Sequence, residues 1–265
     1  MSNFKLILEY NGEGFSGSQI QNVKQSQRTV QGELDKALST YFRSNIATNF
    51  SSRTDAGVHA IGQVVNFHLN SFSELVLSNP DKILIGLNGI LPDDMAVVKI
   101  EPVADDFNAR FSATAREYVY KIFIRKHRPV LRLDSLLWVK ESLDFNAMQA
   151  YAQKFLGEHD FSAYYRAESY AKNPVCNVMK SEMVQESGIC FKYYIRSNRF
   201  LKNMVRRIVG EIIYVGKLAA KGEDVSKLEP NFSYNSENAE NEVVQWSLKA
   251  KAEAPEGLTL MKVFY

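Results

Sequence analysis

The sequence predicts an α+β fold, and three observations lead to it. Apolar residues alternate with others in several short stretches, as in REYVYKIFI at residues 116–124, which is typical of half-buried strands. Elsewhere they recur at helical spacing, as at residues 204–215. The second half repeats these kinds of element without repeating the sequence. We therefore expect two βαβ-like units with antiparallel character, joined near residues 100–108.

Each half is predicted to contain three strands and two helices. The Gly-rich NGEGFSGSQ that follows the first strand cannot easily continue it, and Thr29 is a good N-cap for the first helix. The first half is expected to hold strand 4–10, helix 30–42, strand 63–69, helix 83–91 and strand 97–103. The second half is expected to hold strand 116–124, a helix from Phe145 that stops at Gly157, strand 190–198, helix 204–215 and strand 258–265. The expected domains are residues 1–105 and 106–265.

Composition limits the class of protein. The chain has 265 residues, of which 45% are hydrophobic, 12% aromatic and 23% charged, and these values exclude a largely disordered protein. Cys176 and Cys190 are too few for a disulfide framework or a zinc site, which favours a reducing cytoplasm. MSNFKLILEY lacks a signal-peptide core, and no stretch approaches the roughly 20 apolar residues of a membrane helix. We expect a cytoplasmic protein that does not bind membranes.

Charge is segregated along the chain, although the net charge is only +2. Residues 110–132 contain seven Lys or Arg and one acid, Glu117, and residues 196–207 contain five Lys or Arg and no acid. Residues 223–242, by contrast, contain six acids and one lysine. Such segregation suits a surface that follows phosphates, but a solvated surface also produces such runs by chance. The pattern suggests nucleic-acid binding without being diagnostic of it.

Two arginines of the 204–215 helix differ in where they point. At about 100° per residue, Arg206 lies roughly 110° from the centre of the apolar stripe and Arg207 roughly 150° away on the other side. Arg206 is therefore expected at the margin of the buried face, where its guanidinium could reach a carboxylate in a cleft. Arg207 is expected to point to solvent or to a phosphate. The plainer alternative is that both are solvated helix charges.

The segment SSRTDAGVHA at residues 51–60 carries the candidate catalytic group. Asp55 precedes Gly57 among small residues, and such aspartates are commonplace in turns. Arg53, two residues away, is a cation that could keep this carboxylate ionised, which makes Asp55 a candidate nucleophile or base. The sequence lacks a GxSxG elbow, a P-loop and a pair of histidines at metal-ligand spacing. Spacing alone thus leaves two options, a cleft enzyme and a binding domain.

The residues also resemble a known family. RTDAGVHAIGQVVNFH is similar to the catalytic segment of the tRNA pseudouridine synthase A family, in which the Arg-Thr-Asp string carries the catalytic aspartate. Further segments match in order along nearly the whole chain. They are YNGEGFSGSQIQ with RTVQGELDKAL, LNGILPDDMAV, FNARFSATAREYVYKI, FLKNMVRRIVGEIIYVG and APEGLTLMKVFY.

The resemblance implies a fold and an activity. It implies two ferredoxin-like (RRM-like) units whose mainly antiparallel sheets form one extended sheet with a central catalytic cleft. The family substrate is the anticodon stem-loop of tRNA at uridines 38 to 40, bound by a homodimer across a basic cleft. Uracil is detached from C1′, turned and reattached through C5, with no cofactor or metal. A flipped base needs an aromatic face to stack on and a side chain to take its place.

The resemblance also implies roles for particular residues. Asp55 would attack the target nucleotide, at C6 of the base or at C1′, and Arg53 would help to displace the base. Tyr118 would lie against the uracil and take the C5 proton, and Arg206 would pair with the aspartate. Three more arginines are candidate RNA contacts: Arg110, Arg116 and Arg207.

Four positions depart from the family pattern, namely Asn11 for Asp, Ser18 for Trp, Ser52 for Gly and Asn203 for His. Ser52 could restrict the backbone of the catalytic turn, because Gly is the residue that tolerates left-handed angles. Residues 221–250 do not follow the family pattern. These departures leave open a paralogue that modifies other RNA uridines, and a non-catalytic RNA-binding module with the same fold. The joint presence of Arg53, Asp55, Tyr118 and Arg206 favours the enzyme.

Overall fold

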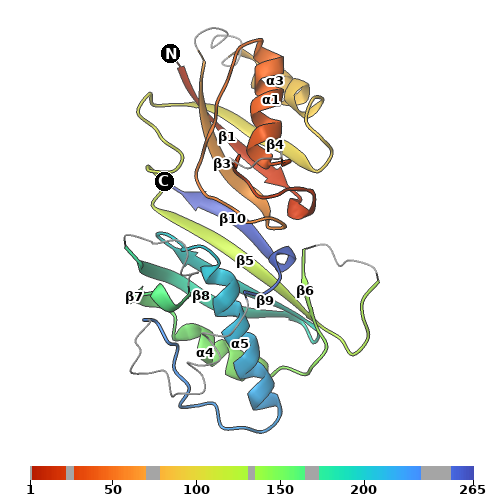
Figure 1. Cartoon of the computed structure of the whole chain (residues 1–265), viewed down its shortest axis with the longest axis vertical. Helices are drawn as coiled ribbons and strands as arrows, with labels where there is room; N and C mark the ends of the chain where they lie inside the picture. The colour runs from red at the N-terminus through yellow and green to blue at the C-terminus, as the bar shows by residue number, and fades with distance from the viewer. Residues whose placement is uncertain (1, 22–26, 70–77, 131–134, 165–172, 234–251) are drawn as a thin grey trace. The chain divides into compact units, whose positions relative to one another are not determined.

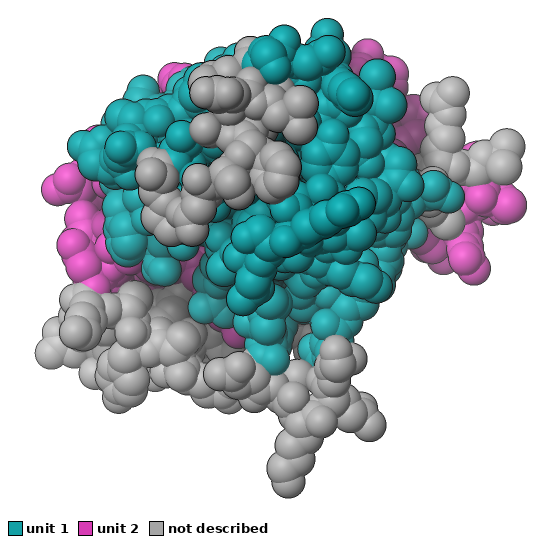
Figure 2. Space-filling view, turned by 90° about the horizontal axis from the view of Figure 1, so that it is seen from above, with its two compact units in different colours: residues 1–114, 259–265 teal, residues 115–258 magenta. Residues whose placement is uncertain are grey.

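The structure is a computed structural model, and it describes residues 2–21, 27–69, 78–130, 135–164, 173–233 and 252–265 (Figure 1). The chain forms two compact units, residues 1–114 with 259–265 and residues 115–258, which Figure 2 colours separately. Each unit combines helices with a mainly antiparallel sheet, so the predicted α+β class is confirmed. The expected domains, 1–105 and 106–265, divide the chain at a different point and stay a prediction.

The first unit is built on a sheet in the order β4-β1-β3-β10. The central strand β1 (Ser2–Tyr10) is antiparallel to both β3 (His59–Leu69) and β4 (Met95–Val103). The strand β10 (Leu258–Phe264) is parallel to β3, and the short β2 (Asn49–Phe50) is antiparallel to it. The last strand of the chain therefore packs beside the strand that follows Asp55.

Two helices cover one face of this sheet (Figure 1). The first, α1 (Val30–Phe42), begins at the predicted cap, because the Thr29 side chain accepts a hydrogen bond from the Gly32 amide at 3.1 Å. The second, α3 (Pro80–Asn88), starts earlier than the expected helix 83–91. Its N-cap is Asn79, whose side chain accepts from the Lys82 amide, and Pro80 suits the first helical position. The rings of Phe4, Phe42 and Phe67 pack together between helix and sheet.

The second unit carries a sheet in the order β5-β9-β8-β7. Its antiparallel strands are β5 (Ala115–Ile124), β9 (Cys190–Ser197), β8 (Val175–Ser187) and β7 (Gly157–Asp160). The three-residue β6 (Leu137–Val139) pairs in parallel with β5. Helices α4 (Phe145–Gln153) and α5 (Met204–Ala220) pack on one face, and the predicted apolar stripe of α5 is buried.

Two sequence expectations in this unit are wrong. The helix from Phe145 ends at Gln153 rather than at Gly157, because Gly157, with φ of 101°, instead begins β7. Three strands, β6, β7 and β8, were not expected, and for the long β8 its pairing with β9 explains why. The register shifts between Val178 and Lys180, which breaks the alternation that marks a strand in sequence. No helix among the described residues is long and apolar enough to cross a bilayer.

A half-buried carboxyl in the first unit makes stability depend on pH. Burial raises the pKa of Asp35 on α1 to about 6, although its Oδ1 accepts a hydrogen bond from the Thr48 hydroxyl at 2.5 Å. Because the folded pKa lies above the unfolded value, this group loses stabilising free energy as the pH rises from about 4 through 6.

We expect Asp35→Asn to remove this pH dependence. The free energy of unfolding of the variant, relative to wild type, should rise by about 1–2 kcal/mol between pH 4.5 and 7, a value reduced for partial exposure of the carboxyl. Urea unfolding at the two pH values measures the difference. If the free energy of unfolding of the variant relative to wild type is the same at pH 4.5 and at pH 7, the assigned direction of the pKa shift of Asp35 is contradicted.

Candidate active site

Asp55 opens a tight turn immediately before β3. The Val58 amide donates to the Asp55 carbonyl at 3.2 Å, and Gly57, the third residue of the turn, has φ of 80°. A positive φ at this place is what a type II turn requires and what glycine supplies without strain. Asp55 itself is half-buried, whereas Arg53 is exposed. The turn expected from sequence is present, and it leaves both side chains accessible.

The residue between them, Thr54, is held on both sides of its backbone by Ser18. The Thr54 amide donates to Ser18 Oγ at 2.8 Å, and the Ser18 amide donates to the Thr54 carbonyl at 3.0 Å. Thr54 Oγ1 lies 2.9 Å from the Tyr10 hydroxyl, and burial raises the pKa of Tyr10 to about 12. Ser18 and Thr54 are both buried. These bonds fix the segment between Arg53 and Asp55 to the end of β1 and the loop that follows it.

The residues before Arg53 are fixed from β3. Gln63 is fully buried, its Oε1 accepts from Ser51 Oγ at 2.7 Å, and its Nε2 donates to the Ser52 carbonyl at 2.9 Å. Among the described non-glycine residues, positive φ occurs at Arg43, Ser135 and Asn203, so Ser52 is outside the left-handed region. A serine therefore fits this backbone, and the glycine that the turn requires is Gly57; the expected effect of Ser52 on the freedom of the turn stays a prediction.

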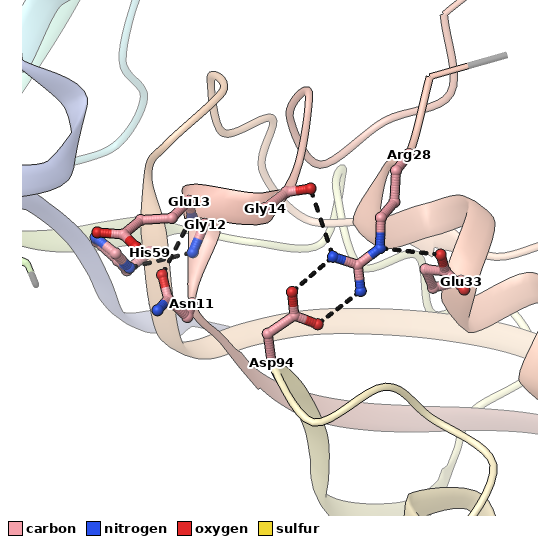
Figure 3. A network of polar contacts seen from close by, with 8 residues as sticks. All are labelled: Asn11, Gly12, Glu13, Gly14, Arg28, Glu33, His59 and Asp94. Carbon is pink, nitrogen blue, oxygen red and sulfur yellow. Dashed lines mark hydrogen bonds and ion pairs between the residues drawn. The ribbon is translucent and has the colours of Figure 1, made fainter.

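The Gly-rich loop after β1 packs against the same turn (Figure 3). Gly12, in the 3-10 helix η1 (Gly12–Gly14), donates its amide to His59 Nδ1 at 3.1 Å. A Cβ on Gly12 would lie only 2.2 Å from the Val58 carbonyl oxygen, so the two backbones touch. The Asn11 side chain caps η1 by accepting from the Glu13 amide. Asn11, one of the departures from the family pattern, thus serves the loop's conformation.

Arg28 ties the outer side of this loop to the rest of the unit (Figure 3). It makes two hydrogen bonds to the Asp94 carboxylate, at 2.6 and 2.7 Å, and one to Glu33 at 3.1 Å. Its guanidinium also lies 4.2 Å from the centroid of the Phe15 ring. Arg28 holds the pKa of Asp94 below its usual range. A two-pronged Arg–carboxylate pair has a defined geometry, so it fixes the loop more tightly than a single contact would.

In the second unit, Tyr118 is buried on β5. It pairs in register with Ile195 of β9, and its ring meets the Phe200 ring edge-on at 5.2 Å. Arg116, two residues earlier on the same strand, donates to the Asn198 carbonyl at 3.0 Å. The segment 198–200 after β9 therefore contacts both candidate substrate-binding residues of β5.

Arg206 is held at the start of α5 from two directions. Its Nε donates to the Glu253 carbonyl at 2.5 Å, and its Nη1 donates to Asn203 Oδ1 at 3.1 Å. The residue is half-buried, as expected for the margin of the apolar stripe. Glu253 is kept in place by its neighbour, because the Tyr120 hydroxyl donates to the Ala254 carbonyl at 2.6 Å.

Arg207 does not simply point to solvent, as the helical wheel suggests. It is half-buried, its Nε atom is inaccessible, and its Nη1 donates to the Ala163 carbonyl at 3.2 Å. The reason is the 3-10 helix η2 (Ser162–Tyr164), which covers this side of α5 and cannot be seen in the helix's own pattern. Arg110, by contrast, is exposed, and its guanidinium lies 5.4 Å from the ring of Phe111, which is 80% exposed.

The candidate residues thus form two groups. Arg53, Asp55 and Arg110 belong to the first unit, and the second unit holds Tyr118, Arg116, Arg206 and Arg207. Sequence reasoning missed the residues that hold the Asp55 turn, chiefly Ser18, Thr54 and Gln63. The dense glycines of residues 12–17 were the available signal. Among the described residues, no group of three or more His, Cys, Asp or Glu side chains is placed to hold a metal ion.

Comparison with known proteins identifies the family. The tRNA pseudouridine synthase family model matches residues 6–112 and 151–265. The chain belongs to the tRNA pseudouridine synthase family. Relatives named tRNA pseudouridine synthase A occur in Nitrosomonas eutropha (41% identity; 80% of this chain and 73% of the relative) and Hydrogenovibrio crunogenus (40%; 86% and 84%). Another, from Chlorobium limicola, is 40% identical over 86% of this chain and 90% of its own.

The comparison with solved structures gives a weaker likeness than the comparison with sequences. The archaeal box H/ACA sRNP Nop10-Cbf5 complex is similar over 78% of this chain and 45% of that chain, at 10% identity and a TM-score of 0.33. This likeness is too weak to support an argument about fold or function.

We expect Ser18→Ala to loosen the Asp55 turn. The substitution leaves the buried Thr54 amide without its acceptor, so the free energy of unfolding should fall by about 1–3 kcal/mol, and the Thr54 amide should exchange with solvent faster. Hydrogen exchange and urea unfolding measure the two effects.

Ser39→Ala is the matched control, because Ser39 Oγ accepts from the Ile46 amide at 3.0 Å in the same unit. It should cost similar stability while leaving exchange at Thr54 unchanged. If Ser18→Ala also leaves exchange at Thr54 unchanged, the Ser18 contact does not hold the turn.

Proposed function

We propose that this protein isomerises uridine to pseudouridine at positions 38 to 40 in the anticodon stem-loop of tRNA, with Asp55 as the nucleophile. The observation that carries the proposal is the Asp55 turn itself. A half-buried carboxylate sits two residues from an exposed arginine, on a backbone fixed by buried hydrogen bonds, in a chain of the tRNA pseudouridine synthase family. A nucleophile held in one geometry loses little entropy on reaching the reacting atom.

In the proposed reaction, the bond that joins uracil to C1′ moves from N1 to C5, and in exchange C5 loses a proton and N1 gains one. The N1–C1′ bond of the uridine breaks, uracil turns within the site, and a C5–C1′ bond forms. C5 then loses its proton and N1 gains one, so that the product has the same atoms as the substrate. Asp55 forms the transient covalent link to the nucleotide and is regenerated as a carboxylate. Tyr118 lies against the uracil and takes the C5 proton, and Arg206 pairs with Asp55.

The candidate arginines suit an RNA substrate from which a base must be displaced. The long, exposed side chain of Arg53 can occupy the place of the displaced base, which lowers the cost of taking that base out of the stack. Arg110, Arg116 and Arg207 provide contacts to the RNA, and in such interfaces phosphate contacts fix position rather than sequence. Relatives that share about 40% of the sequence are named tRNA pseudouridine synthase A, which supports tRNA as the substrate class. We further propose a cytoplasmic homodimer.

Removing the Asp55 carboxylate should separate catalysis from binding. Asp55→Ala and Asp55→Asn should abolish pseudouridine formation on an anticodon stem-loop while RNA affinity stays within about tenfold, roughly 1.4 kcal/mol. Asp105→Asn, which removes an exposed carboxylate elsewhere in the same unit, is the matched control and should retain activity. Wild-type protein without activity on any tRNA would leave the RNA-binding module as the explanation.

Mapping pseudouridines in tRNA from cells with and without the protein tests the positions. We expect the modification to disappear at uridines 38 to 40. Loss at other positions would instead identify a paralogue with a different target.

A further inference from the structure

We propose that Asn203 is a positioning residue that sets the guanidinium of Arg206 for catalysis, acting together with the Glu253 carbonyl. This inference rests on the proposed function, in which Arg206 pairs with Asp55. It assigns the role to a residue that stands before the helix and is itself not expected to touch the substrate.

The backbone of Asn203 is the first observation. It is the N-cap residue of α5 and adopts φ of 65° and ψ of 1°, in the left-handed region, whereas N-cap residues ordinarily have extended angles. The N-caps of α1 and α4, Thr29 and Asp144, are both extended. A left-handed conformation is less favourable for a residue with a Cβ than for glycine, although Asn tolerates it better than most, and such conformations concentrate at functional sites.

The side chain of Asn203 is the second observation. At α1, α3 and α4 the N-cap side chain accepts a hydrogen bond from an amide of the first turn, but the Asn203 side chain makes no such bond. Its Oδ1 accepts from Arg206 Nη1 at 3.1 Å instead. The helix therefore lacks the stabilising side-chain cap. The Asn203 Oδ1 atom, which could have formed it, orients Arg206 instead.

The third observation is the place of Arg206 in its helix. Arg206 lies in the first turn of α5, which contains no acidic residue, and a cation there opposes the positive end of the helix dipole. The helix dipole therefore does not hold this guanidinium in place, and two specific acceptors help to do so. The Glu253 carbonyl takes Nε, Asn203 takes Nη1, and the Glu253 amide donates back to the Arg206 carbonyl at 3.2 Å.

Two acceptors on different nitrogens define the plane of the guanidinium as well as its position. A single acceptor would allow the group to swing about one bond. Because Nε and Nη1 are both engaged, the orientation of the remaining nitrogen is fixed with them. An arginine that must meet a carboxylate during catalysis gains rate from this preorganisation without gaining affinity for the RNA.

Asn203→Gly provides the sharpest test, because it separates positioning from folding. Glycine accepts φ of 65° without strain, so the urea midpoint should equal or exceed that of wild type. The variant nevertheless loses the acceptor for Nη1. We expect the single-turnover rate of pseudouridine formation on an unmodified tRNA transcript to fall at least tenfold, while the dissociation constant for that RNA changes less than threefold.

Two variants and one control complete the experiment. Asn203→Asp keeps an oxygen acceptor at the same atom and should stay within threefold of the wild-type rate, whereas Asn203→Ala should be as slow as Asn203→Gly. Arg43→Gly relieves a similar left-handed angle, φ of 51°, at the exposed C-cap of α1. It should raise the urea midpoint and leave the rate unchanged.

Arg206→Ala distinguishes failure of this inference from failure of the proposed function. If Arg206→Ala is inactive while Asn203→Gly keeps the wild-type rate, or if Asn203→Asp is as slow as Asn203→Gly, the positioning role of Asn203 is overturned. If Arg206→Ala itself keeps the wild-type rate, the proposed role of Arg206 fails, and the role of Asn203 fails with it.

Discussion

The reciprocal pair of hydrogen bonds between Ser18 and Thr54 is the contact on which the geometry of the candidate nucleophile depends. Arg53 and Asp55 flank Thr54, so their Cα positions are set once the Thr54 backbone is fixed. Both partners are buried, and a buried amide or carbonyl without a partner is costly, so the pairing is strongly favoured over an open loop. The exposed and half-buried side chains on either side then remain available for chemistry.

The rest of the first unit supports this pair. Gly12 allows the loop after β1 to touch the backbone at Val58, and Gln63 holds the two serines that precede Arg53. Arg28 and Asp94 close the loop from outside (Figure 3). Each contact joins residues that are at least ten positions apart in sequence, and together they hold a short irregular segment in place.

The second unit follows the same design at Arg206. An arginine placed against the helix dipole is held by Asn203 and by the Glu253 carbonyl, whose segment is anchored through Tyr120 and Ala254. In both units the groups proposed to act lie beside backbone that is fixed by hydrogen bonds to side chains. The N-cap of α5 lacks a side-chain hydrogen bond to the first turn of the helix, and this end of the helix is held by contacts between Arg206 and Glu253.

The sequence alone determined the α+β class, the cap at Thr29, the buried stripe of α5 and the turn at Asp55, because each follows from periodicity or from the preferences of a few neighbouring residues. It also singled out Asp55 and Arg53, through an ordered set of motifs. Only the tertiary structure decided what holds them. Ser18 and Gln63 act through partners brought close by folding, and no local pattern encodes the register shift in β8 or the cover that η2 places over Arg207. Local preferences depend on residues that are neighbours in the sequence, whereas a hydrogen bond between distant residues forms only once the backbone has brought its two atoms within about 3 Å.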